Sequence, residues 1–172
     1  MSFELVSRRL RLNELKRSDG PFIFSLFNDP DCLYYIGDRD IKTQQDALFY
    51  LNDRLIKSYK KHGFGLYKVT PKNSLEAMGI CGLVKREENM PPDIGFAFLP
   101  HYRSNGFCTE AAQTILTWVE ENNISNEILA YTKPDNKASI RVLEKIGMSK
   151  QSIRTLPGQD FESLILSVNF IL

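Results

Sequence analysis

The chain has 172 residues, 42% of them hydrophobic, and its 22 Lys and Arg against 21 Asp and Glu leave a net charge of +1. This length and apolar content predict one domain over residues 1–172 with a core that needs neither disulfides nor a metal. The balanced charge excludes the basic excess typical of nucleic-acid-binding proteins. No apolar run approaches the roughly 18 residues of a bilayer span, so we expect neither nucleic acid nor a membrane as a partner.

The amino terminus and the cysteines both favour a reducing compartment. Residues 1–5 lack a basic region followed by an apolar stretch, so no secretory signal is predicted. Cys32, Cys81 and Cys108 are too few and too scattered for a disulfide framework or a zinc knuckle. We therefore expect a cytoplasmic protein without a metal site.

In the first part of the chain, a short strand precedes two helices. Residues 10–12 alternate as a strand does. The first helix is predicted to start with Asp19 as its cap and to stop at residues 28–31, where a proline follows Asn-Asp. The second starts at a Thr43 cap and continues through leucines at helical spacing. Residues 34–40, between the helices, are expected to form a loop.

The middle of the chain changes to strand patterns. Residues 64–70 and 77–85 predict two strands joined by a Pro-Lys-Asn-Ser turn, and residues 93–99 predict a third after a charged, proline-containing loop. Together they indicate an antiparallel three-strand meander.

The last part alternates helices and strands again. Helices are predicted over residues 109–122 and 137–146, with a strand at 128–131 between them and two strands, 148–154 and 161–171, at the end. The element order predicts an α/β (α+β) single-domain fold, in which a central mixed, mostly antiparallel sheet carries helices on both faces.

The most informative segment joins the last strand of the meander to the next helix, and it reads Arg103-Ser104-Asn105-Gly106-Phe107-Cys108-Thr109. Unpaired backbone N–H groups and the helix dipole make such a helix start a site for a phosphate or pyrophosphate. Gly106 would let the anion approach the backbone closely. An ordinary turn followed by a Thr109 cap fits the same residues, and neither a Walker P-loop nor a dinucleotide fingerprint is present.

These residues carry a resemblance to a known family. The pattern Arg-x-x-Gly-x-Cys before a Thr-Glu-Ala helix start resembles the Arg/Gln-x-x-Gly-x-Gly/Ala motif of the GNAT acetyltransferase superfamily. The segment 136–148, with Asn136, Ser139 and Met148, is similar to the Asn-x-x-Ser-x-x-x-Leu-x-Lys-x-Gly-Phe segment of its ribosomal-protein alanine N-acetyltransferase branch. The Arg-Arg-Leu-Arg-Leu run near the amino terminus also fits that branch. Cys108 departs from the usual Gly or Ala, and Met148 from the usual Phe.

The resemblance implies acetyl-CoA (CoA) as cosubstrate and no metal. It places the pyrophosphate on the backbone amides from Arg103 through Cys108 and on the helix start at Thr109. The strand with Phe96 and Phe98 would splay from residues 128–131 and offer its free backbone groups to pantetheine. Asn136 would bond the pantetheine arm, and Ser139 would lie near the coenzyme sulfur.

Direct transfer of the acetyl group to an amine in a ternary complex then needs alignment, a donor at the carbonyl and a proton for the thiolate. Ser139 could donate to the thiolate, or it could be an ordinary polar residue in a first helical turn. Asp93 could accept the amine proton through water, or it could be a surface residue; Tyr131 is a second candidate. Cys108 at a helix start predicts a lowered thiol pKa, but no base partner supports a covalent mechanism.

Alternatives remain open at this point. A noncatalytic acyl-CoA-binding or regulatory module would keep the anion site and lose Ser139 and the nearby acids. The acceptor could be a peptide or protein amino terminus, a polyamine or an amino sugar, with the aromatic and charged loop 34–40 beside it. Monomer and homodimer both fit.

Overall fold

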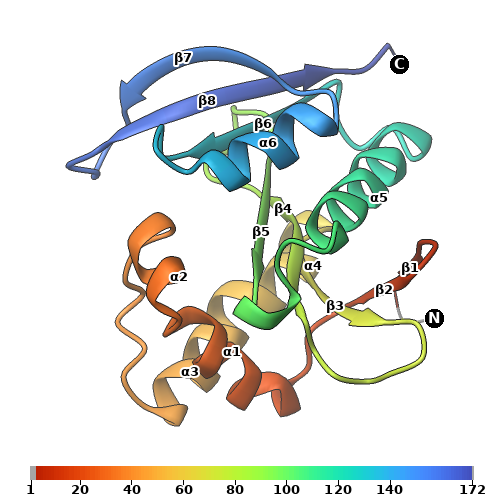
Figure 1. The fold of residues 1–172 in the computed structure, drawn as a ribbon, viewed down its shortest axis with the longest axis vertical. Helices are drawn as coiled ribbons and strands as arrows, with labels where there is room; N and C mark the ends of the chain where they lie inside the picture. The colour runs from red at the N-terminus through yellow and green to blue at the C-terminus, as the bar shows by residue number, and fades with distance from the viewer. Residues whose placement is uncertain (1–2, 172) are drawn as a thin grey trace.

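The computed structural model describes residues 3–171, whose strands form one eight-stranded sheet in the order β1-β2-β3-β4-β5-β6-β8-β7 (Figure 1). The strands are β1 (Glu4–Val6), β2 (Leu10–Asn13), β3 (Leu66–Pro71), β4 (Gly79–Val84), β5 (Asp93–Phe98), β6 (Glu127–Thr132), β7 (Ser149–Thr155) and β8 (Glu162–Asn169). The helices are η1 (Arg17–Asp19), α1 (Gly20–Phe27), α2 (Pro30–Tyr35), α3 (Gln44–Tyr50), η2 (Leu51–Ile56), α4 (Lys57–His62), η3 (Pro100–Tyr102), α5 (Phe107–Glu121) and α6 (Lys137–Lys145).

All neighbouring strands pair antiparallel except β5 and β6, which are parallel. The predicted meander is β3-β4-β5, and the prediction of a mixed, mostly antiparallel sheet is confirmed. Within residues 3–171, no helix is both long and apolar enough to cross a bilayer.

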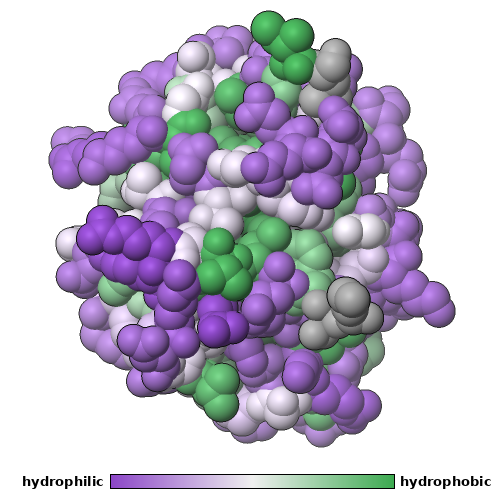
Figure 2. All heavy atoms as spheres, turned by 90° about the vertical axis from the view of Figure 1, so that its right-hand side faces the viewer, coloured by the Kyte–Doolittle hydropathy of each residue, from purple (hydrophilic) through white to green (hydrophobic). Residues whose placement is uncertain are grey.

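Helices cover both faces of the sheet, as predicted (Figure 1). Successive residues of a strand point to opposite faces, and β4 shows this directly: Cys81 and Leu83 pack with α5 and α6, whereas Ile80 packs with α1, α3 and η2. The sheet therefore separates two apolar cores. The face that carries α5 is mostly hydrophilic on its surface, with small separated hydrophobic areas (Figure 2).

Several local predictions were wrong. Strand β1 and helix α2 were not predicted; α2 exists because the Asp29 side chain accepts a hydrogen bond from the Cys32 N–H and Pro30 occupies the first helical position. Asp19 stands before α1 but does not cap it, because its carboxylate accepts from the Lys16 N–H and from Lys68 Nζ instead.

The second predicted helix is one continuous rod with an irregular centre. Thr43 caps it in a capping box with Asp46, as the sequence indicated. The central segment η2 is a π-helix, in which the Lys57 N–H bonds the carbonyl of Asn52 five residues earlier. The rod ends at His62, where Gly63 adopts a φ of 77°.

Candidate active site

The sheet opens between β5 and β6. These strands share a single aligned pair, Asp93 with Leu129, while β4 pairs with β5 along its whole length from Val84 to Gly79. The β6-facing edge of β5 beyond Asp93 therefore has no strand partner. The splay that the resemblance implied is present, and it leaves backbone groups near Phe96 and Phe98 open to a ligand.

A groove of about 1400 Å³ occupies this opening and continues over both faces of the sheet. This is larger than the roughly 300–1,000 Å³ of common small-ligand pockets, so it has room for two reactants. It brings together most of the predicted site residues: Asp93, Phe96, Phe98, Arg103, Ser104, Gly106, Phe107, Cys108, Thr109, Asn136 and Ser139. Asn105 does not line the groove, because its side chain turns back to donate to the Arg103 carbonyl at 2.8 Å.

The anion site stands at the start of α5. The helix begins at Phe107, two residues earlier than predicted, and Gly106 is its N-cap with a φ of 76°. This left-handed backbone is easy for glycine and strained for other residues. The first N–H groups of a 15-residue helix consequently face the groove without a helical acceptor. We call the segment from Arg103 to Thr109 the cradle.

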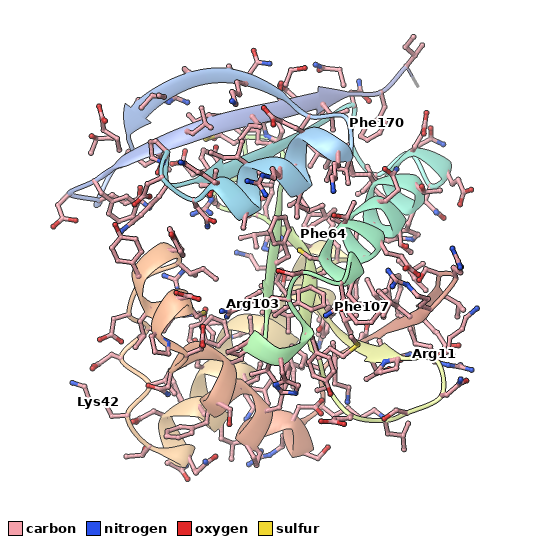
Figure 3. All side chains as sticks on the ribbon, viewed as in Figure 1. Arg11, Lys42, Phe64, Arg103, Phe107 and Phe170 are labelled. Carbon is pink, nitrogen blue, oxygen red and sulfur yellow. The ribbon has the colours of Figure 1, made fainter. Side chains whose placement is uncertain are left out.

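The side chain of Arg103 does not take part in the cradle. Its Nε donates to the Phe98 carbonyl at 2.9 Å, and its other nitrogens pair with Asp29 and Asp31, each at 2.6 Å. Figure 3 shows Arg103 and Phe107 on either side of the base of β5, with Arg103 directed toward α2. The Arg103 N–H is also engaged, because it donates to the Pro100 carbonyl at 3.2 Å.

Sequence reasoning missed the support of the cradle by Arg9 and Glu110. Glu110 accepts from the Ser7 hydroxyl and from the Arg9 N–H and Nε at 2.6–2.7 Å. Arg9 also donates to the Asn105 carbonyl at 3.0 Å and lies 4.4 Å from the centroid of the Phe107 ring. Burial opposes ionisation of Glu110, but these hydrogen bonds outweigh it and lower its pKa. The Arg-Arg-Leu run near the amino terminus was the one feature of the sequence that could have pointed to Arg9.

At the opposite wall, Asn136 caps α6. Its side-chain oxygen accepts the Ser139 N–H at 3.2 Å, and the amide nitrogen of that side chain is left to donate to a coenzyme. Ser139 is half-buried and lines the groove, and within residues 3–171 its hydroxyl has no hydrogen-bond partner. The Ser139 hydroxyl is thus free to meet a ligand.

Asp93 is not the surface residue that one interpretation held, because it is 2% exposed. Its carboxylate accepts from Arg86 Nε at 2.9 Å and from Arg86 Nη2 at 3.1 Å, and the guanidinium lies 4.7 Å from the Tyr131 ring centroid. Burial raises the pKa of Asp93 to about 6, although Arg86 opposes the shift. Burial likewise raises the pKa of Tyr131, the alternative candidate.

The predicted lowering of the Cys108 pKa is wrong. Burial raises the pKa of this thiol to about 12, because its side chain packs against the core that contains Cys81. Desolvation disfavours the thiolate more than the helix dipole favours it. Nowhere in the described residues do three or more His, Cys, Asp or Glu side chains gather to hold a metal ion.

The segment predicted as the acceptor loop begins at the end of α2, and its first residue contacts the far side of the opening. The Tyr34 hydroxyl donates to Asp135 at 2.8 Å, joining α2 to the turn before α6. The Lys133 ammonium lies 4.1 Å from the Tyr34 ring centroid and 4.7 Å from that of Phe161. This contact spans the two parts of the sheet that the splay separates.

The chain matches an acetyltransferase family in sequence and solved acetyltransferases in structure. Residues 9–149 match the family described as acetyltransferase (GNAT) domain. The Bacillus subtilis protein YkkB is 37% identical over 149 residues, covering 84% of both chains. The solved GNAT-family acetyltransferase from Bacillus anthracis superposes with a TM-score of 0.82 at 22% identity, over 97% of this chain and 98% of that one. The ribosomal-protein-S5-alanine acetyltransferase from Vibrio fischeri gives 0.78 at 19% identity, over 98% and 96%.

Proposed function

Because the chain belongs to the GNAT acetyltransferase family, we propose that it moves the acetyl group of acetyl-CoA directly to an amine in a ternary complex. The observation that carries this proposal is the continuity of the groove, which joins the cradle on one face of the sheet, through the β5–β6 opening, to the helices on the other face. Both reactants can therefore reach the same opening from opposite sides.

The coenzyme is proposed to bind along the splayed strand. Its pyrophosphate would lie on the backbone amides of the cradle and its pantetheine along the free edge of β5, with the Asn136 amide nitrogen beside it. Two solved structures of this fold support the assignment. A RimL ribosomal L7/L12 acetyltransferase, with a TM-score of 0.78, contains coenzyme A. The microcin C7 self-immunity acetyltransferase MccE, with a TM-score of 0.80, contains acetyl-CoA.

The groups of this chain supply alignment, charge stabilisation and proton handling. Alignment alone accounts for roughly 7–11 kcal/mol in favourable cases. A backbone N–H near Phe96 or Phe98 polarises the thioester carbonyl, and the Ser139 hydroxyl donates to the departing thiolate. Asp93 accepts the amine proton through water; a pKa of about 6 keeps it ionised at neutral pH and still basic enough to take a proton.

A noncatalytic acyl-CoA-binding module is the second candidate. Such a module has no use for a free hydroxyl at the sulfur end of the groove or for a buried carboxylate with a raised pKa, and this chain has both. The names of the ribosomal-protein acetyltransferases place protein amino termini among the acceptors of this fold. We therefore propose a protein amino terminus or a small amine as the acceptor here.

Thiol release from acetyl-CoA in the presence of a chelator tests the activity, with a panel of peptides, polyamines, amino sugars and amino acids. We expect release with at least one class of amine, and calorimetric binding of CoA without metal. Binding of CoA with no release for any class would favour the noncatalytic module. No binding at millimolar CoA would refute the proposal.

A further inference from the structure

We propose that the acceptor amine carries a carboxylate or a phosphate, and that Arg39 and Arg54 bind this anion. The inference rests on the proposed transfer and narrows its substrate class. Both arginines line the groove and are exposed. Arg39 follows α2 and Arg54 lies in η2, so they belong to the helices on the face opposite α5 and α6, where the acceptor is expected.

The charges along the groove do not balance. Each carboxylate that lines it is already engaged: Asp31 by Arg103, Asp40 by Lys42, Asp46 by the Lys42 and Thr43 N–H groups, Asp53 by Lys57 and Arg54, and Asp93 by Arg86. By contrast, none of the ion pairs among residues 3–171 includes Arg39 or Lys133. The contact of Arg54 with its neighbour Asp53 is long, at 3.8 Å. Positive charge is therefore left over.

Arg39 and Arg54 share the groove with Tyr50. Burial raises the pKa of Tyr50, and the positive charges of Arg39 and Arg54 both act on its hydroxyl to lower it. All three side chains belong to the part of the groove lined by α2, α3, η2 and the loop after α2. An anion placed there would meet two guanidinium forks, whose paired N–H groups match the geometry of carboxylate and phosphate oxygens.

Arg54 lies in the π-helical segment η2, which determines the position of its side chain along the groove. A π-helix is a rare conformation that concentrates at functional sites, and η2 places three consecutive residues, Asp53, Arg54 and Leu55, along the groove. The groove lining on this face of the sheet also includes the apolar residues Ile36, Leu66 and Ile80. The best acceptor is therefore an amine with an apolar body and one anionic group, and a polycationic amine is disfavoured.

Binding of inorganic phosphate to CoA-saturated protein tests the site without relying on turnover. Saturation with CoA blocks the cradle, so the remaining phosphate binding reports on the arginines. We expect the double variant R39Q/R54Q to weaken this binding about tenfold or more, and the charge-matched variant K60Q/K72Q, which alters residues outside the groove, to leave it unchanged. Equal binding in wild type and R39Q/R54Q, or no binding to wild type, would overturn the proposal.

Transfer assays with matched amines then separate the two anions. Phenylalanine is compared with phenethylamine, and O-phosphoethanolamine with ethanolamine, at saturating acetyl-CoA. The anionic member should have the higher kcat/KM, and R39Q/R54Q should reduce the preference by raising KM. A preference for the members that lack the anionic group would contradict the anion subsite while leaving acetyl transfer intact. Transfer to no amine, with phosphate binding still lost in R39Q/R54Q, would refute the proposed function and keep the anion site.

Discussion

The carboxyl of Asp93 is both buried and paired with Arg86, and these two conditions shift its pKa in opposite directions. The net result is a folded-state pKa of about 6, above the value of about 3.9 expected for an unfolded chain. Between these two pH values the folded protein binds more protons than the unfolded chain. Stability therefore falls as pH rises through this window.

We expect Asp93→Asn to remove this pH dependence. From pH 4 to pH 6, the free energy of unfolding of the wild type should fall relative to the variant by up to about 3 kcal/mol. Urea titrations at both pH values measure it. The exposed Asp160→Asn serves as the control. Parallel curves for wild type and Asp93→Asn would show that Asp93 keeps an ordinary pKa.

Ser139→Ala tests the role of the free hydroxyl. Because a hydrogen bond to sulfur gains most when the thiolate forms, its loss should lower turnover and leave CoA affinity nearly unchanged. General-acid assistance contributes about 10²–10⁴-fold, and a hydrogen bond alone gives less. Single-turnover thiol release and a thermal melt are measured together, with exposed Ser152→Ala as control. Turnover within about twofold of wild type would remove Ser139 from the mechanism.

Gly106→Val tests the cradle. A side chain there would strain a backbone with a φ of 76°, and its Cβ would lie 3.3 Å from Arg9 Nη2. We expect CoA binding to weaken about tenfold or more. Gly158→Val, at a φ of 79° in the β7–β8 turn, imposes similar backbone strain away from the groove. Equal CoA affinity in folded Gly106→Val protein would place the anion elsewhere.

At the scale of elements, the cradle depends on a loop that is remote in sequence. The segment between β1 and β2 holds the start of α5 through Arg9 and Glu110, 101 residues apart. The pair is part-exposed, so its contribution to global stability is modest. The pair matters more for the conformation of the cradle than for global stability, because Arg9 contacts both Asn105 and Phe107.

Arg9→Gln should therefore weaken CoA binding more than it lowers stability. We expect a loss of affinity of about fivefold to tenfold, since hydrogen bonds to charged groups contribute about 1.5–3 kcal/mol and only part of this reaches the ligand. Arg11→Gln, which breaks an exposed pair between Arg11 of β2 and Glu4 of β1, is the matched control. Calorimetry measures the CoA affinity of both variants, and melting curves measure their stability. If Arg9→Gln and Arg11→Gln changed CoA affinity equally, Arg9 would have a structural role only.

At the scale of the whole molecule, β5 and β6 share a single aligned pair where other neighbours share a full register. A coenzyme bound in the opening would touch both parts of the sheet. CoA at about 100 times its Kd should stabilise the protein by about 2.7 kcal/mol. For a chain of this size we expect Tm to rise by roughly 5–10 °C, with a much smaller rise in Gly106→Val. An unchanged wild-type Tm would contradict binding in the opening.

The sequence by itself determined the order of elements, the meander and the location of the cradle. These depend on local signals: side-chain periodicity, the Thr43 capping box, and Gly106 between a strand and a helix. The family resemblance added the splay of β5 from β6, which spacing alone does not predict.

Only the tertiary structure decided which hydrogen-bond and ion-pair partners the site residues have. Arg103 is held by α2, Arg9 by α5, and Asp93 by Arg86 in a buried pair. Cys108 stands at a helix start, yet it lies against the core and keeps its proton. Burial and long-range pairing depend on segments that meet only in the fold, and these set the pKa and the free hydrogen-bonding groups of each side chain. A linear pattern names the residues of the site, but their chemistry follows from their neighbours in space.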